Sequence, residues 1–174
     1  FAYSTSLNFD HKQLLYASVN VSPKLGIFRP RWGFYYKQQF FDTRKYGASK
    51  ALSRPLLLCL LDNNFALSET MNAAISLNAA TPNADGFLMM KSNYSVDLRF
   101  DKSFANRTWI IYLSANDIFK TTKERWTMYG QGSGTTKDCY NYTRSISLQV
   151  TYNFNAKRSK YKGTGAGNEE KSRL

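Results

Sequence analysis

Long apolar runs are absent from this chain of 174 residues. The longest one extends from Leu56 to Leu61, whereas a helix that crosses a membrane needs about 20 consecutive apolar residues. The mean hydropathy of −0.48 is low as well. Together these observations exclude a helical membrane protein. They leave room for a transmembrane β-barrel, because its strands need only about 9–11 residues each and half of their side chains face water.

Side chains that commonly carry catalysis or bind metals are also scarce. His11 is the only histidine, and its place at an expected turn indicates a solvated side chain. Cys59 and Cys139 lack the close spacing of a metal or redox motif, although a disulfide between them stays open. The glycine-rich stretches 130–137 and 163–167 lack the residues and the following helix that a phosphate-binding loop needs. We therefore expect a protein that is not an enzyme, with no cofactor and no bound metal.

Aromatic residues, in contrast, are abundant and regularly spaced. There are 12 Phe, 12 Tyr and 3 Trp, and many alternate with polar residues. The clearest stretch has Phe28, Trp32, Phe34, Tyr36 and Phe40 on one parity and Arg29, Arg31, Lys37 and Gln39 on the other. Successive side chains of a strand point to opposite faces. The pattern therefore predicts a sheet with lipid on one side and water on the other.

The same period of two recurs along the chain and predicts about eight antiparallel strands. They are expected at 1–9, 15–21, 28–41, 56–65, 71–79, 94–101, 109–116 and 142–154, the seventh continuing past a kink at 117–119 to about 129. Short connections (22–26, 66–70 and 102–106) alternate with longer ones (42–54 and 130–138, the second of which begins with a flexible loop at 130–134), beside a compact turn at 81–86. The short set is expected at one rim and the long set at the other.

Positive charge dominates, with a net charge of +12. Basic surfaces with interleaved aromatics can bind single-stranded nucleic acid. Here the excess is dispersed: residues 155–174 hold six Lys or Arg and two Glu, and the remaining basic residues are spread over the rest of the chain. The dispersion favours lumen faces, turns and a basic tail over a nucleic-acid partner.

The end of the chain resembles a known family. Tyr152-Asn153-Phe154-Asn155 closes the last alternating strand with a terminal aromatic pattern of outer-membrane barrels, and the tail from Lys160 to Leu174 is similar to that of a Bacteroidetes outer-membrane β-barrel family among the TonB-dependent receptors. The segment from Leu113 to Phe119 resembles the Asp-Ile-Phe segment of that family. Asp101-Lys102-Ser103-Phe104 resembles one of its short periplasmic turns.

The resemblance implies a 22-stranded barrel with an N-terminal plug that imports a bulky nutrient using energy from the inner membrane. Residues 1–154 would be the C-terminal part of that barrel and residues 155–174 a basic, Gly/Lys-rich periplasmic tail. The chain starts without Met inside an alternating segment, so we expect a fragment. Its implied partners are outer-membrane lipid, the N-terminal remainder of the barrel and the plug, with TonB bound only by the missing upstream region.

Parity assigns the candidate site residues to two faces. Arg29, Arg31, Tyr35 and Lys37 are expected to line the lumen, as contacts for substrate or plug. The expected lipid-facing aromatics are Phe28, Trp32, Phe34, Tyr36, Phe40, Trp109, Tyr152 and Phe154. Asp97, Arg99 and Asp101 share a face, and we expect ion pairs with neighbouring strands rather than acid–base chemistry.

Two alternatives remain at this point. About eight strands suffice to close a small self-contained outer-membrane barrel, and a soluble basic β module that binds nucleic acid or glycan is the other. A fragment of a larger barrel predicts a curved open sheet, whereas a self-contained barrel predicts that the first and last strands pair.

Overall fold

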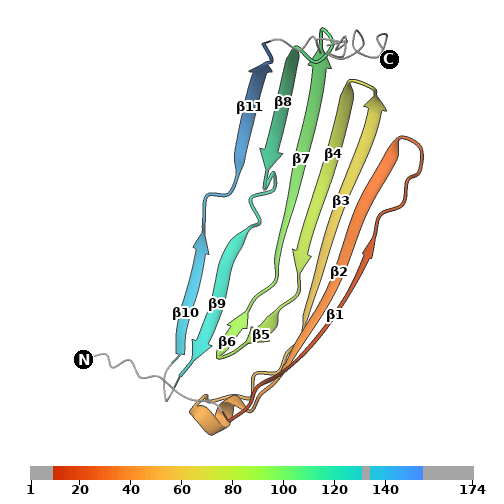
Figure 1. Ribbon diagram of the computed structural model, residues 1–174. Coiled ribbons are helices and arrows are strands. Elements are labelled where there is room, and N and C mark those ends of the chain that lie inside the picture. Colours follow the sequence, from red (N-terminus) through yellow and green to blue (C-terminus); the bar gives the residue numbers. More distant parts are fainter. Residues whose placement is uncertain (1–9, 131–133, 155–174) are drawn as a thin grey trace, which may run out of the picture.

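The computed structural model describes residues 10–130 and 134–154, and Figure 1 shows their arrangement. Seven long strands form one antiparallel sheet in the order β1-β2-β3-β4-β7-β8-β11, which we call the wall. Its strands are β1 (Gln13–Val21), β2 (Phe28–Phe40), β3 (Leu56–Ser68), β4 (Met71–Ala80), β7 (Asn93–Phe104), β8 (Trp109–Asn116) and β11 (Ser145–Tyr152). The predicted antiparallel all-β fold is confirmed.

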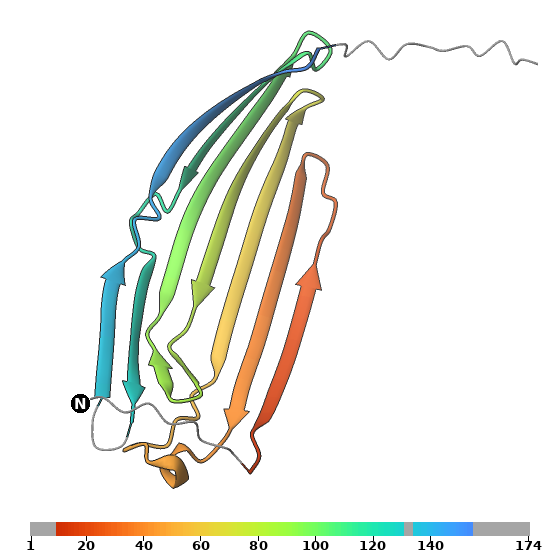
Figure 2. The same ribbon diagram turned by 60° about the vertical axis from the view of Figure 1, so that its left-hand side comes forward.

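A second sheet of four strands lies at one end of the wall (Figures 1 and 2). It has the order β10-β9-β6-β5, made of β5 (Asn83–Asp85), β6 (Leu88–Met90), β9 (Lys123–Tyr129) and β10 (Gly134–Tyr140). The connection between β2 and β3 lies at the same end and contains a short 3-10 helix, Thr43–Tyr46. We call this end the long-connection rim. Within the described residues the opposite end carries short turns between strands, and we call it the short-turn rim.

The wall is open. β1 and β11 are its two edge strands, and within the described residues neither pairs with a second strand. Both views show a curved sheet whose edges do not meet (Figures 1 and 2). This agrees with the open sheet expected of a partial barrel. The expected strand at 1–9 and the tail at 155–174 lie outside the described residues. Among the residues described, no helix is long and apolar enough to cross a membrane.

Two predicted loops contain strands. The long connection expected at 130–138 is wrong from Gly134 onward, because β10 pairs with β9 from Gly134–Tyr129 to Tyr140–Lys123. This strand is polar, and cross-strand contacts such as Thr127 with Thr136 stabilise it. The compact turn expected at 81–86 is a hairpin of β5 and β6, with Gly86 at a φ of 58° where a left-handed backbone favours glycine.

Most other boundaries agree with the expected strands to within a few residues. The kink at 117–119 is confirmed, since β8 ends at Asn116 and β9 begins at Lys123. The last strand begins at Ser145 rather than Tyr142. Tyr142 has a φ of 51°, so the backbone breaks there instead of continuing the strand.

Most buried side chains lie at the long-connection rim and not in the wall, where Pro30 on β2 is an exception. The buried apolar residues are Phe41, Ala48, Leu52, Ala74 and Ala84, and the buried polar ones are Gln39, Thr43, Asn83 and Asp117. Only Ala74 and Gln39 of this set belong to wall strands. A single sheet has two open faces, so the wall has no core of its own.

Candidate functional site

The strand register separates the wall into an apolar face and a polar face. Across the middle of the sheet, Trp32 pairs with Leu61, Leu61 with Leu77, and Leu77 with Val96. The rows next to this one continue in the same way, for example Leu98–Ala115–Ile146 and Phe100–Leu113–Leu148. One parity of all seven strands therefore forms a largely apolar surface, with Lys102 near the short-turn rim and Gln38 near the long-connection rim, as a lipid-facing wall requires.

Aromatic side chains lie at both margins of the apolar face. At the short-turn rim, Trp109 pairs with Tyr152 at 4.5 Å between ring centroids, and Tyr152 contacts Phe154 at the same distance. Towards the long-connection rim lie Tyr36, Phe40 and Tyr94, and between the margins lie mostly aliphatic side chains. Aromatic girdles at two membrane interfaces have this arrangement.

The predicted lipid-facing aromatics share this face. Phe28, Trp32, Phe34, Tyr36 and Phe40 occupy one parity of β2, and Trp109 and Tyr152 lie on the corresponding parity of β8 and β11. Phe34, Phe40, Trp109, Tyr152 and Phe154 are exposed. That lipid covers them stays a prediction.

One pair of polar side chains lies within the apolar face, and its hydrogen-bonding groups are satisfied without water. The indole Nε1–H of Trp32 donates to Asn63 Oδ1 at 3.0 Å, and Asn63 Nδ2 donates to the backbone oxygen of Ile75. Unpaired donors are costly away from water. The pair thus allows an indole in the middle of an otherwise apolar surface.

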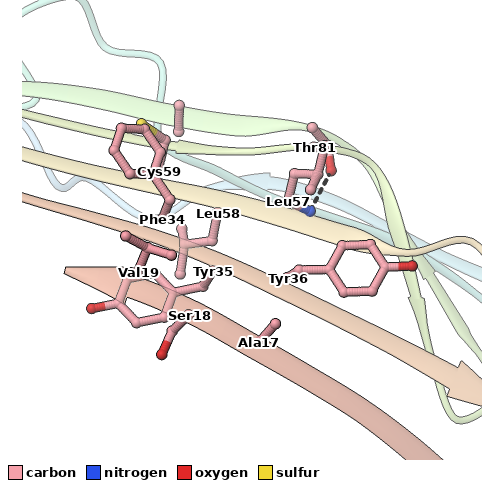
Figure 3. Close-up of a pocket in the computed structure, with 11 residues that line it drawn as sticks. Ala17, Ser18, Val19, Phe34, Tyr35, Tyr36, Leu57, Leu58, Cys59 and Thr81 are labelled. Atoms are coloured by element: carbon pink, nitrogen blue, oxygen red, sulfur yellow. Dashed lines mark hydrogen bonds between the residues drawn. The ribbon is translucent and has the colours of Figure 1, made fainter.

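The apolar face also carries a hollow of about 450 Å³ over β1 to β4 (Figure 3). Val19, Phe34, Cys59 and Leu57 are among its lining residues, and the Leu57 amide donates to Thr81 Oγ1 at 2.9 Å at one end. Cys59 and Cys139 are both free thiols, so the disulfide that the sequence left open is not formed. The lining suits an aliphatic chain better than a polar ligand.

On the polar face, ion pairs cross several strands. Asp62 accepts from Arg31 on the neighbouring strand and from Ser76 on the other side, at 2.9 Å for Ser76. Arg99 lies 4.0 Å from the same carboxylate and donates to Asn64. The expected ion pairing of Arg99 is confirmed, and it joins β2, β3, β4 and β7 into one polar network.

The four predicted lumen residues share the polar face but form no single cluster. Arg31 and Tyr35 line one hollow of about 480 Å³, and Arg29 lines a separate one of about 270 Å³. Within the described chain Arg29 has no carboxylate partner. Lys37 donates to Asp85 Oδ2 at 2.8 Å and so contacts the β5–β6 hairpin.

The side chain of Tyr35 lies over Gly33. A Cβ added at Gly33 would come within 2.8 Å of both Cε2 and Oη of Tyr35, and within 2.9 Å of Asn20 Oδ1. The Tyr35 hydroxyl donates to that Asn20 oxygen at 3.0 Å, which ties β2 to the edge strand β1. The missing side chain at Gly33 is therefore what allows the ring to lie flat on the sheet.

The buried cluster at the long-connection rim was missed by the sequence analysis. Gln39 is only 1% exposed, and its amide binds three backbone groups: it donates to the oxygens of Leu52 and Gly86 and accepts from the Gly86 amide at 2.7 Å. Thr43 Oγ1 accepts from the Leu52 amide. These bonds fix the β2–β3 connection and the β5–β6 hairpin against each other.

Asp117 organises the break between the two sheets. Its carboxylate accepts from the Thr143 hydroxyl at 2.7 Å and from the amides of Thr121 and Thr122. Its own amide donates to Asp97 on β7 at 2.7 Å. Burial opposes ionisation of Asp117, but these hydrogen bonds outweigh it and lower its pKa to about 2. One carboxylate thus joins the breaks in two adjacent strands.

Comparison with known proteins gives one match. A family model described as an outer membrane protein beta-barrel family matches residues 1–152. No curated protein and no solved structure matches the chain. Within the described residues no group of three or more His, Cys, Asp or Glu side chains is placed to hold a metal ion.

Proposed function

Because the chain belongs to the outer membrane protein β-barrel family, we propose that it is the C-terminal part of the barrel of a TonB-dependent receptor that imports a bulky nutrient. The family places the chain in an outer-membrane barrel. The receptor class, the import and the Bacteroidetes origin extend that statement, and they rest on the sequence resemblance together with the open wall.

One observation carries the proposal: within residues 10–130 and 134–154, an apolar face that runs across seven strands ends in two open edges. A strand edge left unpaired in lipid exposes backbone N–H and C=O groups, each at a cost of several kcal/mol. For the 8 residues of β11, that amounts to a cost on the order of 10 kcal/mol or more. Further strands on both sides remove this cost, and a larger barrel supplies them.

The rims suggest how the wall is oriented. Outer-membrane barrels have short periplasmic turns and longer extracellular connections. The short-turn rim is therefore assigned to the periplasm, together with residues 155–174, and the long-connection rim to the outside. The polar face contacts the plug or the nutrient through Arg29, Arg31, Tyr35 and Lys37. TonB binds upstream of this chain, and nucleic acid is not a partner.

The barrel size can be tested by electrophoresis without boiling. We expect the full-length protein to run as a folded, heat-modifiable barrel, and residues 1–174 alone to give no such band. A heat-modifiable band from residues 1–174 alone would contradict the proposal and support the self-contained eight-stranded barrel. Folding of that chain in plain buffer would instead support a soluble β module.

Import requires a second experiment, in cells. Uptake of labelled oligosaccharides, metal chelates and peptides is compared in cells with and without the full-length gene, each with and without a functional TonB. We expect one nutrient class to need both proteins. Gene-dependent uptake that continues without TonB would contradict the receptor assignment and leave the barrel assignment intact.

A further inference from the structure

Most of the basic excess of the described chain lies at the long-connection rim. In the middle of the wall, the arginines at 29, 31 and 99 are matched in number by the aspartates at 62, 97 and 101. At the rim, the β2–β3 connection, the second sheet and the strand breaks together hold ten Lys and Arg and five Asp and Glu. The lumen wall is thus close to neutral, and the positive charge lies beyond its end.

Three of the rim cations border the apolar face directly. Lys120 and Lys123 follow the end of β8, and Arg144 precedes β11. The last apolar pair of these two strands is Ala115 with Ile146. The three cations, which we call the collar, therefore lie where the apolar surface ends, at the level of lipid headgroups if lipid covers that surface.

Carboxylates in the described part of the chain do not neutralise the collar. Within the described residues none of its three side chains forms an ion pair. Asp117 is 2% exposed and is occupied by hydroxyl and amide donors. Glu124 pairs with Lys137, and Asp138 lies 3.9 Å from Lys91. All three collar side chains are exposed, so an anion from outside the chain can reach them.

Exposed aromatic side chains accompany the collar. Phe119, which precedes Lys120, is 65% exposed, and Tyr142, two residues before Arg144, is 87% exposed. The Lys120 ammonium lies 5.0 Å from the centre of the Tyr140 ring. A free anion in water needs no exposed aromatic side chains beside it. Cations and aromatics together are typical of an interface where acyl chains meet charged headgroups.

We propose that the collar binds the phosphate groups of a glycolipid in the outer leaflet of the outer membrane. The Arg144 guanidinium can take two phosphate oxygens at once, and Lys120 and Lys123 supply ammonium donors. The inference rests on the proposed orientation, in which the long-connection rim is outermost. It assigns the collar to lipid rather than to the nutrient, and it fixes how deep the wall lies in the membrane.

The test uses the purified full-length protein in detergent, titrated with diphosphoryl lipid A. The variant Lys120→Gln/Lys123→Gln/Arg144→Gln is compared with Lys24→Gln/Lys45→Gln/Arg107→Gln, which loses the same charge away from the collar. Each basic residue near an anionic lipid surface contributes about a factor of five in affinity. The collar variant should therefore bind about a hundredfold more weakly, and the control variant should bind like the wild type.

Equal affinity of the two variants would overturn the proposal, as would wild-type binding of inorganic phosphate with the affinity shown for the lipid. Wild-type binding of fully dephosphorylated lipid A with undiminished affinity would overturn it as well. Heat-modifiable mobility shows that each variant is folded, and the three single substitutions replace the triple variant if it is not. Nutrient uptake is measured separately, so loss of the receptor assignment and loss of the collar assignment are distinguishable.

Discussion

Replacing Gly33 by alanine should separate β1 from β2 locally. The new Cβ would lie 2.8 Å from the Tyr35 ring, so the ring must leave the sheet and its hydrogen bond to Asn20 must break. Overpacking costs about 1–3 kcal/mol and a lost hydrogen bond about 1 kcal/mol. Because the ring borders an open hollow and can move aside, we expect the free energy of unfolding to fall by about 1–3 kcal/mol.

A double-mutant cycle isolates this contact. In a Tyr35→Ala background the clash with the ring is gone, and the remaining close contact, with Asn20 Oδ1 at 2.9 Å, involves the end of a side chain that is then free to turn away. Gly33→Ala should therefore cost less than about 0.5 kcal/mol in that background. Gly134→Ala is the matched control, because a Cβ there meets nothing closer than 3.5 Å, the Met128 oxygen. The assay is the urea dependence of the heat-modifiable band of the full-length barrel, with tryptophan emission as a second probe.

Either of two results would contradict the predicted clash between an alanine at position 33 and the Tyr35 ring. If Gly33→Ala is as mild as Gly134→Ala, the ring does not lie over the glycine. If the cost of Gly33→Ala is the same with and without Tyr35, the clash comes from some other group. A large effect confined to the Tyr35-containing background supports the geometry.

Three further predictions concern polar contacts. Asn63→Leu alone should destabilise the barrel by about 1–2 kcal/mol, because it leaves the Trp32 indole unpaired. The double variant Trp32→Phe/Asn63→Leu should be near neutral in urea unfolding. Additive destabilisation by the two substitutions would contradict the pairing. The hydrogen bonds from Lys137 first, and from Trp126, lower the pKa of Glu124 from 4.5 to about 2, so these contacts persist well below pH 4.5 and are lost as pH falls through about 2. Trp126 emission should therefore change with a midpoint near pH 2 in the wild type and show no such step in Glu124→Gln. Asp117→Ala removes charge-assisted hydrogen bonds worth about 1.5–3 kcal/mol each. Amide hydrogen exchange at Thr121 and Thr122 should therefore accelerate at least about tenfold, while the amides of the wall stay protected. Unchanged exchange would show that Asp117 does not hold the break.

The wall was predictable because its signal is local. Alternation of residues such as Met71, Ile75 and Leu77 fixes both the strand and its face without knowledge of its neighbours. The break at Asp117 was also visible, since the alternation fails there. The register between β1 and β2 was not predictable, because it depends on the turn that joins them. This register places Tyr35 next to Asn20.

The rim was hidden for a different reason. Gln39 has the parity of a lumen residue, but its partners in the β5–β6 hairpin are 47 positions away, and no spacing within β2 indicates them. The strand β10 has little apolar alternation, and its pairing with β9 is supported by polar contacts such as Lys137 with Glu124. Contacts between distant polar residues leave no periodic trace in a single sequence.

The position of the buried cluster has a consequence for how freely this sequence can vary. Fluid acyl chains adapt to any apolar side chain, so if lipid covers the apolar face as proposed, exchanges among Leu, Ile, Val and Phe on that face of β4 or β8 should be tolerated. Gln39, Thr43 and Leu52 are instead enclosed by fixed backbone groups, where shape and hydrogen bonds must match. A saturation-mutagenesis map would therefore look inverted relative to that of a soluble domain, permissive along the strands and restrictive in the connections that usually vary most.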